Sequence, residues 1–245
     1  MLIDARGMHY RDLNERIRHA VAAGEAAIEL QNVNGHRYIA DGIESDVRID
    51  VHGVPGNDLG AFMDGPTVVV HANAQDALGN TMNDGKIVVH GDAGDVIGYG
   101  MRGGRILVSG HVGYRVGIHM KAYRSQRPEL VAGGTAGDFL GEYMAGGTLV
   151  VLGLNKWRGQ PLVGDYCATG IHGGTVYLRG DWDRGCIATK DVAVREADGE
   201  DLQQIRPAVE EFCAEFGLDP EAVLSERFSK LTPLSHRPYG AKYAA

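Results

Sequence analysis

The sequence predicts a mainly β protein, a right-handed parallel β-helix built from 19-residue coils. The first observation is a spaced series of glycines: Gly60, Gly79, Gly98 and Gly117 in steps of 19, then Gly141 and Gly164 after 24 and 23. The second is a column three positions after each glycine: Met63, Met82, Met101, Met120, Met144 and Cys167. The third is a short β-branched segment ahead of each glycine-rich stretch, which favours strands over helices.

The period explains the composition of these columns. A 19-residue repeat is too short for two helices or a propeller blade. At ~3.3 Å per residue it holds two or three short strands with their turns. Parallel coils stack at ~4.8 Å, so equivalent residues lie above one another and the methionines are expected to fill the core as a ladder. A phosphate-binding glycine loop is disfavoured, because such a loop occurs once, between a strand and a helix.

Residues 1–45 are predicted to form an α/β cap. Leu13, Ile17 and Val21 follow i, i+4, i+8 spacing, which indicates an amphipathic helix that ends near Gly24. The segments AAIEL and HRYIA are predicted as strands, with NVNG as the turn between them. A solenoid needs its open end covered, and this segment is expected to cover it.

Residues 46–190 are predicted to be the β-helix itself. Its strands are expected at VRIDVH, TVVVH, KIVVH, RILVS, PELVAG, TLVVL and TVYLR. Two longer intervals contain the inserted segments KAYRSQR, residues 121–127, and NKWRGQP, residues 155–161. Insertions in solenoids leave the coil as loops, so both are expected on the surface.

Residues 191–245 are predicted to form C-terminal helices and an extended tail, with the helical region at 196–231. The helical stripe consists of Leu202, Ile205, Val209, Phe212 and Phe216. Asp219 and Pro220 are predicted to begin a second helix as its N-cap and first residue. The ending LTPLSHRPYGAKYAA is rich in proline and is expected to be an irregular arm.

Composition excludes several classes of protein. A net charge of −8 argues against a nucleic-acid surface and against an anionic membrane. No apolar run is long enough to span a bilayer, and the charged N-terminus does not resemble a secretory signal. Three scattered cysteines do not make a disulfide framework, so a reducing, cytoplasmic location is expected.

One candidate binding site is a column of histidines. His52, His71 and His90 follow the same period of 19 and are expected to stack, one per coil. Three imidazoles at ~4.8 Å intervals offer metal ligands in principle. The column continues as Ser109, Gly133, Leu152 and Arg179, which supply no conventional ligand set. The sequence therefore favours a surface histidine ladder over a metal centre, and whether the column binds anything is left open.

Acidic residues recur beside the glycines and offer a second candidate. They are Asp58, Asp76, Asp95, Asp138 and Asp165. A carboxylate pair acts as acid and base in solenoid carbohydrate enzymes, which would make this a self-sufficient hydrolase or lyase. Aspartate also suits turns and bonds to nearby backbone, and recurrence at coil corners favours this use.

The remaining candidates are a thiol and three exposed side chains. Cys167 stands in the methionine column, so it is expected to be buried and inert. Arg124, Trp157 and Arg158 lie in the two insertions. They are typical interface residues, although Trp157 packed back on the coil is an equal alternative. No GxSxG, P-loop, HExxH or EF-hand pattern occurs.

The segment GTAGDFLGEYMAGGTLVVLGLN, residues 134–155, resembles a known family. Together with RDLN, NVNGHRYIADGI and GNTMNDGKIVVHGDAGD, it is similar to the C-terminal GXGXG domain of the large (alpha) subunit of glutamate synthase. The resemblance covers about residues 1–190. It implies a right-handed β-helix, an architecture shared with one subunit of formylmethanofuran dehydrogenase and one of N-methylglutamate synthase. The ending RPYGAKYA resembles the stand-alone form of the domain.

The resemblance implies a role in nitrogen metabolism as a non-catalytic scaffold subunit of an oxidoreductase complex. It implies no catalytic, cofactor-binding or metal residue on this chain, with FMN and an iron–sulfur cluster on partner chains. Those partners would be the amidotransferase and the flavin/iron–sulfur synthase subunits. A formylmethanofuran-dehydrogenase-like or N-methylglutamate-synthase-like complex is the alternative, and a homo-oligomer is left open.

Overall fold

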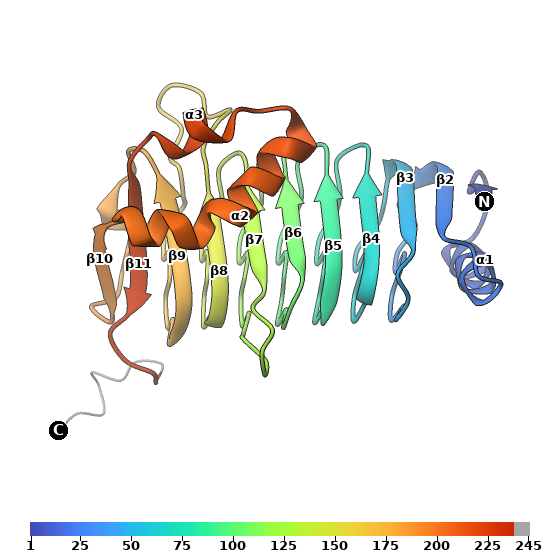
Figure 1. Ribbon diagram of the computed structural model, residues 1–245, viewed down its shortest axis with the longest axis horizontal. Helices are drawn as coiled ribbons and strands as arrows, with labels where there is room; N and C mark the ends of the chain where they lie inside the picture. The colour runs from blue at the N-terminus through green and yellow to red at the C-terminus, as the bar shows by residue number, and fades with distance from the viewer. Residues whose placement is uncertain (238–245) are drawn as a thin grey trace.

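The computed structural model describes residues 1–237 and places them in one elongated solenoid (Figure 1). Its sheet has eleven strands in the order β1-β2-β3-β4-β5-β6-β7-β8-β9-β11-β10. The elements are β1 (Leu2–Asp4), α1 (Tyr10–Ala22), β2 (Ala27–Asn34), β3 (Arg48–Val54), β4 (Asp64–Val70), β5 (Asp84–Val89), β6 (Arg105–Val108), β7 (Glu129–Ala132), β8 (Ala145–Val151), β9 (Gly173–Arg179), η1 (Arg184–Cys186), β10 (Val192–Glu196), α2 (Gly199–Phe216), α3 (Pro220–Leu224) and β11 (Phe228–Pro233).

The parallel register confirms the predicted β-solenoid. Ile49 in β3 pairs with Val68 in β4, which pairs with Ile87 in β5 and then Ile106 in β6, so the residue number rises by 19 at each step. The step lengthens to 24 between β6 and β7 and to 27 between β8 and β9, where the two insertions leave the coil. Each of the seven segments predicted as strands of the repeat overlaps one of β3 to β9.

Two apolar layers hold the solenoid together. The inward side chains of the strands meet the methionine column in the lumen, where Met63, Met82, Met101, Met120 and Met144 are fully buried. The outward side chains, such as Val88, Leu107 and Val131, form a second cluster beneath α2 and α3. Both faces of the sheet are therefore covered, which explains why the strands are apolar along most of their length.

The N-terminal helix lies where the sequence predicts it. Leu13 and Ile17 are buried in α1, and His9 accepts a hydrogen bond from the Arg11 amide at its N-terminus. The strand predicted for HRYIA is absent: Tyr38 and Ala40 have φ of 62° and 63°, and this alternation of left-handed residues does not form an extended ladder. These residues form a coil corner instead.

The predicted NVNG turn is also wrong, because residues 32–34 belong to β2. The pairing of β2 with β3 shifts register between Leu30 and Val33, and Asn32 in this bulge has φ of 59°. The parallel ladder therefore includes β2, N-terminal to residue 46, while the division of the chain into domains stays a prediction.

In the last coil, the position of the spaced glycines is not held by the residue that the sequence predicts. The Gly141 amide donates to the Val116 carbonyl, and in the next coil it is the Ala168 amide that donates to the Leu140 carbonyl. Ala168, with φ of 57°, therefore takes the position assigned to Gly164. Ile171 replaces Cys167 in the methionine column, and Cys167 is buried beneath Leu140 in the neighbouring apolar column.

The C-terminal segment returns along the outer face of the sheet. Figure 1 shows α2 running diagonally across the strands, and its apolar stripe packs on them as predicted. Its N-terminus has a capping box between Asp198 and Asp201, and Gly217 ends it with φ of 68°. The predicted helical region is wrong for residues 228–231 and the predicted irregular tail is wrong for residues 231–233, because residues 228–233 form β11. The rest of the tail beyond residue 237 lies outside the described residues.

A buried carboxylate with two basic partners fastens α2 to the final hairpin. The Asp201 carboxylate is 2% exposed and lies 2.5 Å from Lys230 Nζ in β11 and 2.5 Å from Arg195 Nη1 in β10. Burial opposes ionisation of Asp201, but hydrogen bonds from Arg195 and Lys230 outweigh it and hold its pKa well below the usual range. The helix is thus tied to a strand pair that sequence reasoning did not identify.

Candidate functional site

Each coil contains a segment in which alternate residues have left-handed backbone conformation. The positive φ angles recur at the position of the spaced glycines such as Gly60 and Gly117, two residues before it and two residues after it. We call these segments the αL ridge: residues 38–42, 58–62, 77–81, 96–100, 115–119, 139–143 and 166–170. Their amides donate to carbonyls of adjacent coils, which explains how non-glycine residues are held in this conformation.

The central residue of each ridge segment points into the core. A Cβ built on Gly117, whose φ is 72°, would lie 2.7 Å from Leu149 Cδ1 on the inner face of β8. The ridge therefore lies across the lumen from the sheet, on the opposite side of the solenoid from α2. Side chains two residues to either side face outward, and Phe62 and Tyr166 are 52% and 48% exposed.

Outward side chains of the later coils gather into what we call the aromatic patch. Its members are Tyr99, Tyr114, Arg115, His119, Phe139, Tyr143 and Tyr166. Phe139 stacks on Tyr166 with ring centroids 4.8 Å apart, and His119 stacks on Tyr143 at 5.4 Å. Exposed aromatic rings grouped with arginine are typical of interaction surfaces.

An ion pair to a buried glutamate fixes the arginine of the aromatic patch. Arg115 Nε donates to Glu142 Oε2 at 2.9 Å, and Glu142 is only 8% exposed. The guanidinium carbon is held 5.0 Å from the centroid of Phe139 and 5.4 Å from that of Tyr114. The group is therefore ordered before any partner arrives, which reduces the entropy lost on binding.

The histidine column stacks as the periodic spacing predicts. The rings of His52 and His71 are 4.5 Å apart, and those of His71 and His90 are 5.4 Å apart. His71 Nε2 is 2.9 Å from Asp50 Oδ1, so a neighbouring carboxylate pairs with the column. Burial and the adjacent His71 lower the pKa of His90. Across residues 1–237, no group of three or more His, Cys, Asp or Glu side chains is arranged to hold a metal ion.

Asp76, Asp95 and Asp138 accept hydrogen bonds from the backbone of neighbouring coils, and Asp58 accepts one from a side-chain amide. Asp76 Oδ1 accepts from the Asp95 amide at 2.9 Å, and Asp95 Oδ1 accepts from the Tyr114 amide at 2.9 Å. Asp138 accepts from the Asp165 amide at 2.8 Å, and Asp58 accepts from Asn80 Nδ2 at 3.0 Å. These bonds are the ones the turn interpretation predicts, and the hydrolase alternative gains no support from them.

The insertion loops expose the side chains expected of them. Trp157 is 64% exposed, yet the edge of its ring also contacts His111, with centroids 5.7 Å apart. Arg158 is exposed nearby, and the Arg124 guanidinium lies over the Tyr123 ring in the other loop. Trp157 is therefore exposed, as an interface residue would be, and is also packed against the coil, so each of the two predictions for it holds in part.

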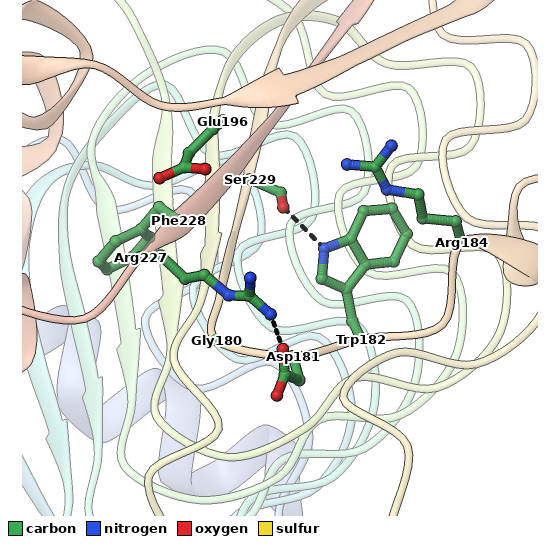
Figure 2. Close-up of a pocket in the computed structure, with 8 residues that line it drawn as sticks. All are labelled: Gly180, Asp181, Trp182, Arg184, Glu196, Arg227, Phe228 and Ser229. Atoms are coloured by element: carbon green, nitrogen blue, oxygen red, sulfur yellow. Dashed lines mark hydrogen bonds and ion pairs between the residues drawn. The ribbon is translucent and has the colours of Figure 1, made fainter.

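Sequence reasoning missed a small cavity at the C-terminal end of the solenoid. Figure 2 shows its lining, which comes from the segment after β9, from β10 and from β11. The cavity measures about 220 Å³. Arg227 pairs with Asp181, and Trp182 Nε1 donates to Ser229 Oγ at 2.9 Å. Only the pairing of β11 with β9 and β10 brings these residues together, so no local sequence signal marks them.

Comparison with known proteins gives one family, one relative and one structural neighbour. A sequence model of the GXGXG motif matches residues 18–234. A Methanocaldococcus jannaschii protein described as "uncharacterized protein MJ1350" is 49% identical over 253 residues, covering 99% of this chain and 96% of the relative. A chain of the formyltransferase/hydrolase complex from Methylorubrum extorquens, solved with methylofuran, superposes with a TM-score of 0.65 at 22% identity; the match covers 86% of this chain and 79% of that one. Among residues 1–237, no helix is both long and apolar enough to cross a membrane.

Proposed function

Because the chain belongs to the GXGXG-motif family, we propose that it is a non-catalytic scaffold subunit of a multi-subunit enzyme complex in the cytoplasm. The observation that carries this proposal is the aromatic patch on the αL ridge. Its tyrosines are substantially exposed, with Tyr99, Tyr114 and Tyr166 at 41%, 42% and 48%. A partner subunit that covers them removes apolar area from water and gains contacts with rings that are already ordered.

The position of the patch supports binding to a protein rather than to a small molecule. Its rings are spread over successive coils along the ridge, and none of them lines the cavity of Figure 2. Small ligands favour concave sites that bury most of their surface. Aromatic and arginine side chains on an exposed, rigid surface match the composition of protein interfaces.

We propose a glutamate-synthase-like complex as the first assembly. In it, partner chains would transfer the amide nitrogen of glutamine to 2-oxoglutarate, using FMN and an iron–sulfur cluster that they themselves hold. The resemblance of residues 134–155 to the glutamate synthase domain supports this assignment. The β-helix would then pack the amidotransferase and synthase subunits against each other.

A formyltransferase/hydrolase-type complex is the second candidate. The solved chain that superposes over 86% of this protein comes from such an assembly, and this observation favours the candidate. An N-methylglutamate-synthase-like assembly belongs to the same scaffold class. In each case the expected contribution of this chain is a surface that positions other subunits.

Affinity purification from native cells tests the proposal. We expect the tagged chain to co-purify in fixed stoichiometry with partner chains identified by mass spectrometry. Amidotransferase and flavin/iron–sulfur chains would establish the first complex, and formyltransferase or hydrolase chains would establish the second. A chain that purifies alone under gentle conditions would refute the scaffold role.

A pair of matched variants tests the patch itself. Tyr166→Glu places a charge in the aromatic patch, whereas Leu218→Glu makes the same change on the α2–α3 turn, at 42% exposure, on the other side of the solenoid. We expect loss of partners for Tyr166→Glu only. Equal recovery of partners with both variants, each folded by circular dichroism, would exclude the patch as the interface.

A further inference from the structure

Two of the three cysteines meet at the C-terminal end of the solenoid. Cys167 lies in the last coil and is completely buried, and Cys186 ends the short helix η1 and is 6% exposed. The Cys167 amide donates to the Cys186 carbonyl at 3.0 Å. Although β9 separates them in the sequence, the two are adjacent because η1 lies against the last coil.

The backbone contact brings both cysteines within range of a disulfide. A 3.0 Å hydrogen bond between the amide of one and the carbonyl of the other places their Cα atoms within roughly 7 Å of each other. Natural disulfides span Cα separations of about 4.4–6.8 Å. Both thiols are free in this structure and belong to the same apolar cluster.

The two thiols differ in reactivity. A hydrogen bond from Cys167 lowers the pKa of Cys186, and the same bond together with burial raises the pKa of Cys167 well above its usual value. The more exposed cysteine therefore carries the larger fraction of thiolate, which is the nucleophilic form. Cys213 differs from both: it is buried beneath α2 in the other apolar cluster, and burial raises its pKa.

We propose that Cys167 and Cys186 form a reversible dithiol–disulfide site that reacts with low-molecular-weight disulfides such as oxidised glutathione and locks η1 to the last coil. The Cys186 thiolate attacks one sulfur of the small disulfide and expels one thiolate, leaving a mixed disulfide. Cys167, losing its proton, attacks Cys186 Sγ and expels the second. The protein loses two electrons and two protons, and the small disulfide is reduced to two thiols.

The lock acts on the segment beside the end cavity. Arg184 begins η1 and also lines the cavity of Figure 2, together with Asp181 and Trp182. With the thiols reduced, η1 is held on the last coil by non-covalent contacts. With the disulfide formed, the chain between residues 167 and 186 becomes a closed loop, which restricts both the unfolded chain and local opening of the cap.

The experiment compares the full-length protein in reduced and oxidised glutathione buffers. Trypsin cleaves after Arg158, Arg179, Arg184 and Lys190, so the disulfide would join the peptides 159–179 and 185–190. We expect this cross-linked peptide, a fall from three free thiols to one, and full reversal by dithiothreitol. We also expect the oxidised protein to melt roughly 5 °C higher or more.

Three serine variants separate the roles of the cysteines. Cys213→Ser is the control and should form the cross-link as the wild type does. Cys167→Ser should stop at the mixed disulfide on Cys186, and Cys186→Ser should remain unmodified while folded. Failure of the wild-type protein to form the 159–179/185–190 cross-link, or a cross-link to Cys213 instead, would overturn the site. An unchanged melting temperature after complete cross-linking would overturn the lock.

Discussion

Replacing Gly117 by alanine tests the role of the αL ridge in the stability of the solenoid. The new Cβ would lie 2.7 Å from Leu149 Cδ1, 2.9 Å from Cδ2 and 3.3 Å from Cγ. Because the contact includes Cγ, a rotation of the terminal methyl groups cannot relieve it and the whole side chain must move. The backbone adds a second cost, because φ at this position is 72°.

The expected loss of stability follows from these terms. A left-handed conformation costs alanine about 1–2 kcal/mol relative to glycine. Displacing a well-packed leucine costs about 1–3 kcal/mol. Burial of the added methyl group contributes about 0.8 kcal/mol in the opposite direction, and the stiffer unfolded chain contributes about 0.4–1 kcal/mol. We therefore expect Gly117→Ala to lower the free energy of unfolding by about 2 kcal/mol.

Urea denaturation followed by circular dichroism measures this change. The double variant Gly117→Ala/Leu149→Val removes the colliding atoms and should be no less stable than Gly117→Ala alone, although Leu149→Val by itself costs about 1 kcal/mol. Ala168→Gly, at the equivalent position of the last coil, should change stability by less than about 0.5 kcal/mol, because relief of the left-handed strain offsets the lost methyl. A wild-type stability for Gly117→Ala, or simple additivity in the double variant, would refute the reasoning.

Three further predictions concern the core, the ridge and the C-terminal helix. Met101→Asp buries an unpaired carboxylate in the fully enclosed methionine ladder and should destabilise the protein by about 4 kcal/mol; an unchanged melting temperature would contradict an inward ladder. Val96→Asn should raise stability by about 1 kcal/mol in thermal melts, because Val96 is a β-branched residue at φ of 59°, a conformation that asparagine tolerates; a lower melting temperature would count against strain there. Asp201→Asn should cost about 3 kcal/mol at pH 7 by leaving Lys230 and Arg195 without their buried partner. Since the pKa of Asp201 is lowered by folding, its contribution is complete above about pH 4 and is lost as the pH falls further, so the stability of the variant should vary less than that of the wild type below pH 4 in acid titrations.

Periodicity predicted the solenoid because each coil repeats the same packing problem. Glycine and methionine recur wherever the backbone approaches the core and a gap must be filled, so spacing alone located the ladder. The signal failed at the two ends, where Ala40 and Ala168 hold the ridge position. Alanine adopts φ near 60° at a modest cost, so the position does not require glycine. The missing signal was the apolar spacing around each alanine, one residue before it and three after it. These residues are Ile39 and Ile43 around Ala40, and Cys167 and Ile171 around Ala168.

Other features depend on contacts between segments distant in sequence. β10 and β11 pair although α2 and α3 lie between them in the chain, and nothing local to either strand specifies that partner. The aromatic patch likewise draws Tyr99 and Tyr166 from coils far apart in sequence. Most of its members share two outward positions of the ridge, yet the residue type there changes from Val96 to Arg115 to Phe139, because outward positions are free of the packing that makes the inner columns uniform. The 19-residue repeat therefore predicts the core better than it predicts a binding surface.

Because each coil contributes one strand to the ladder, the length of the solenoid changes only in equal steps. Each coil adds one strand to the sheet and lengthens the molecule by ~4.8 Å. Duplication of a 19-residue unit would move the N-terminal helix and the C-terminal hairpin apart by that increment without altering either end. Subunits attached near opposite ends would then separate by the same step. The number of coils in such a chain sets the distance between whatever its two ends hold.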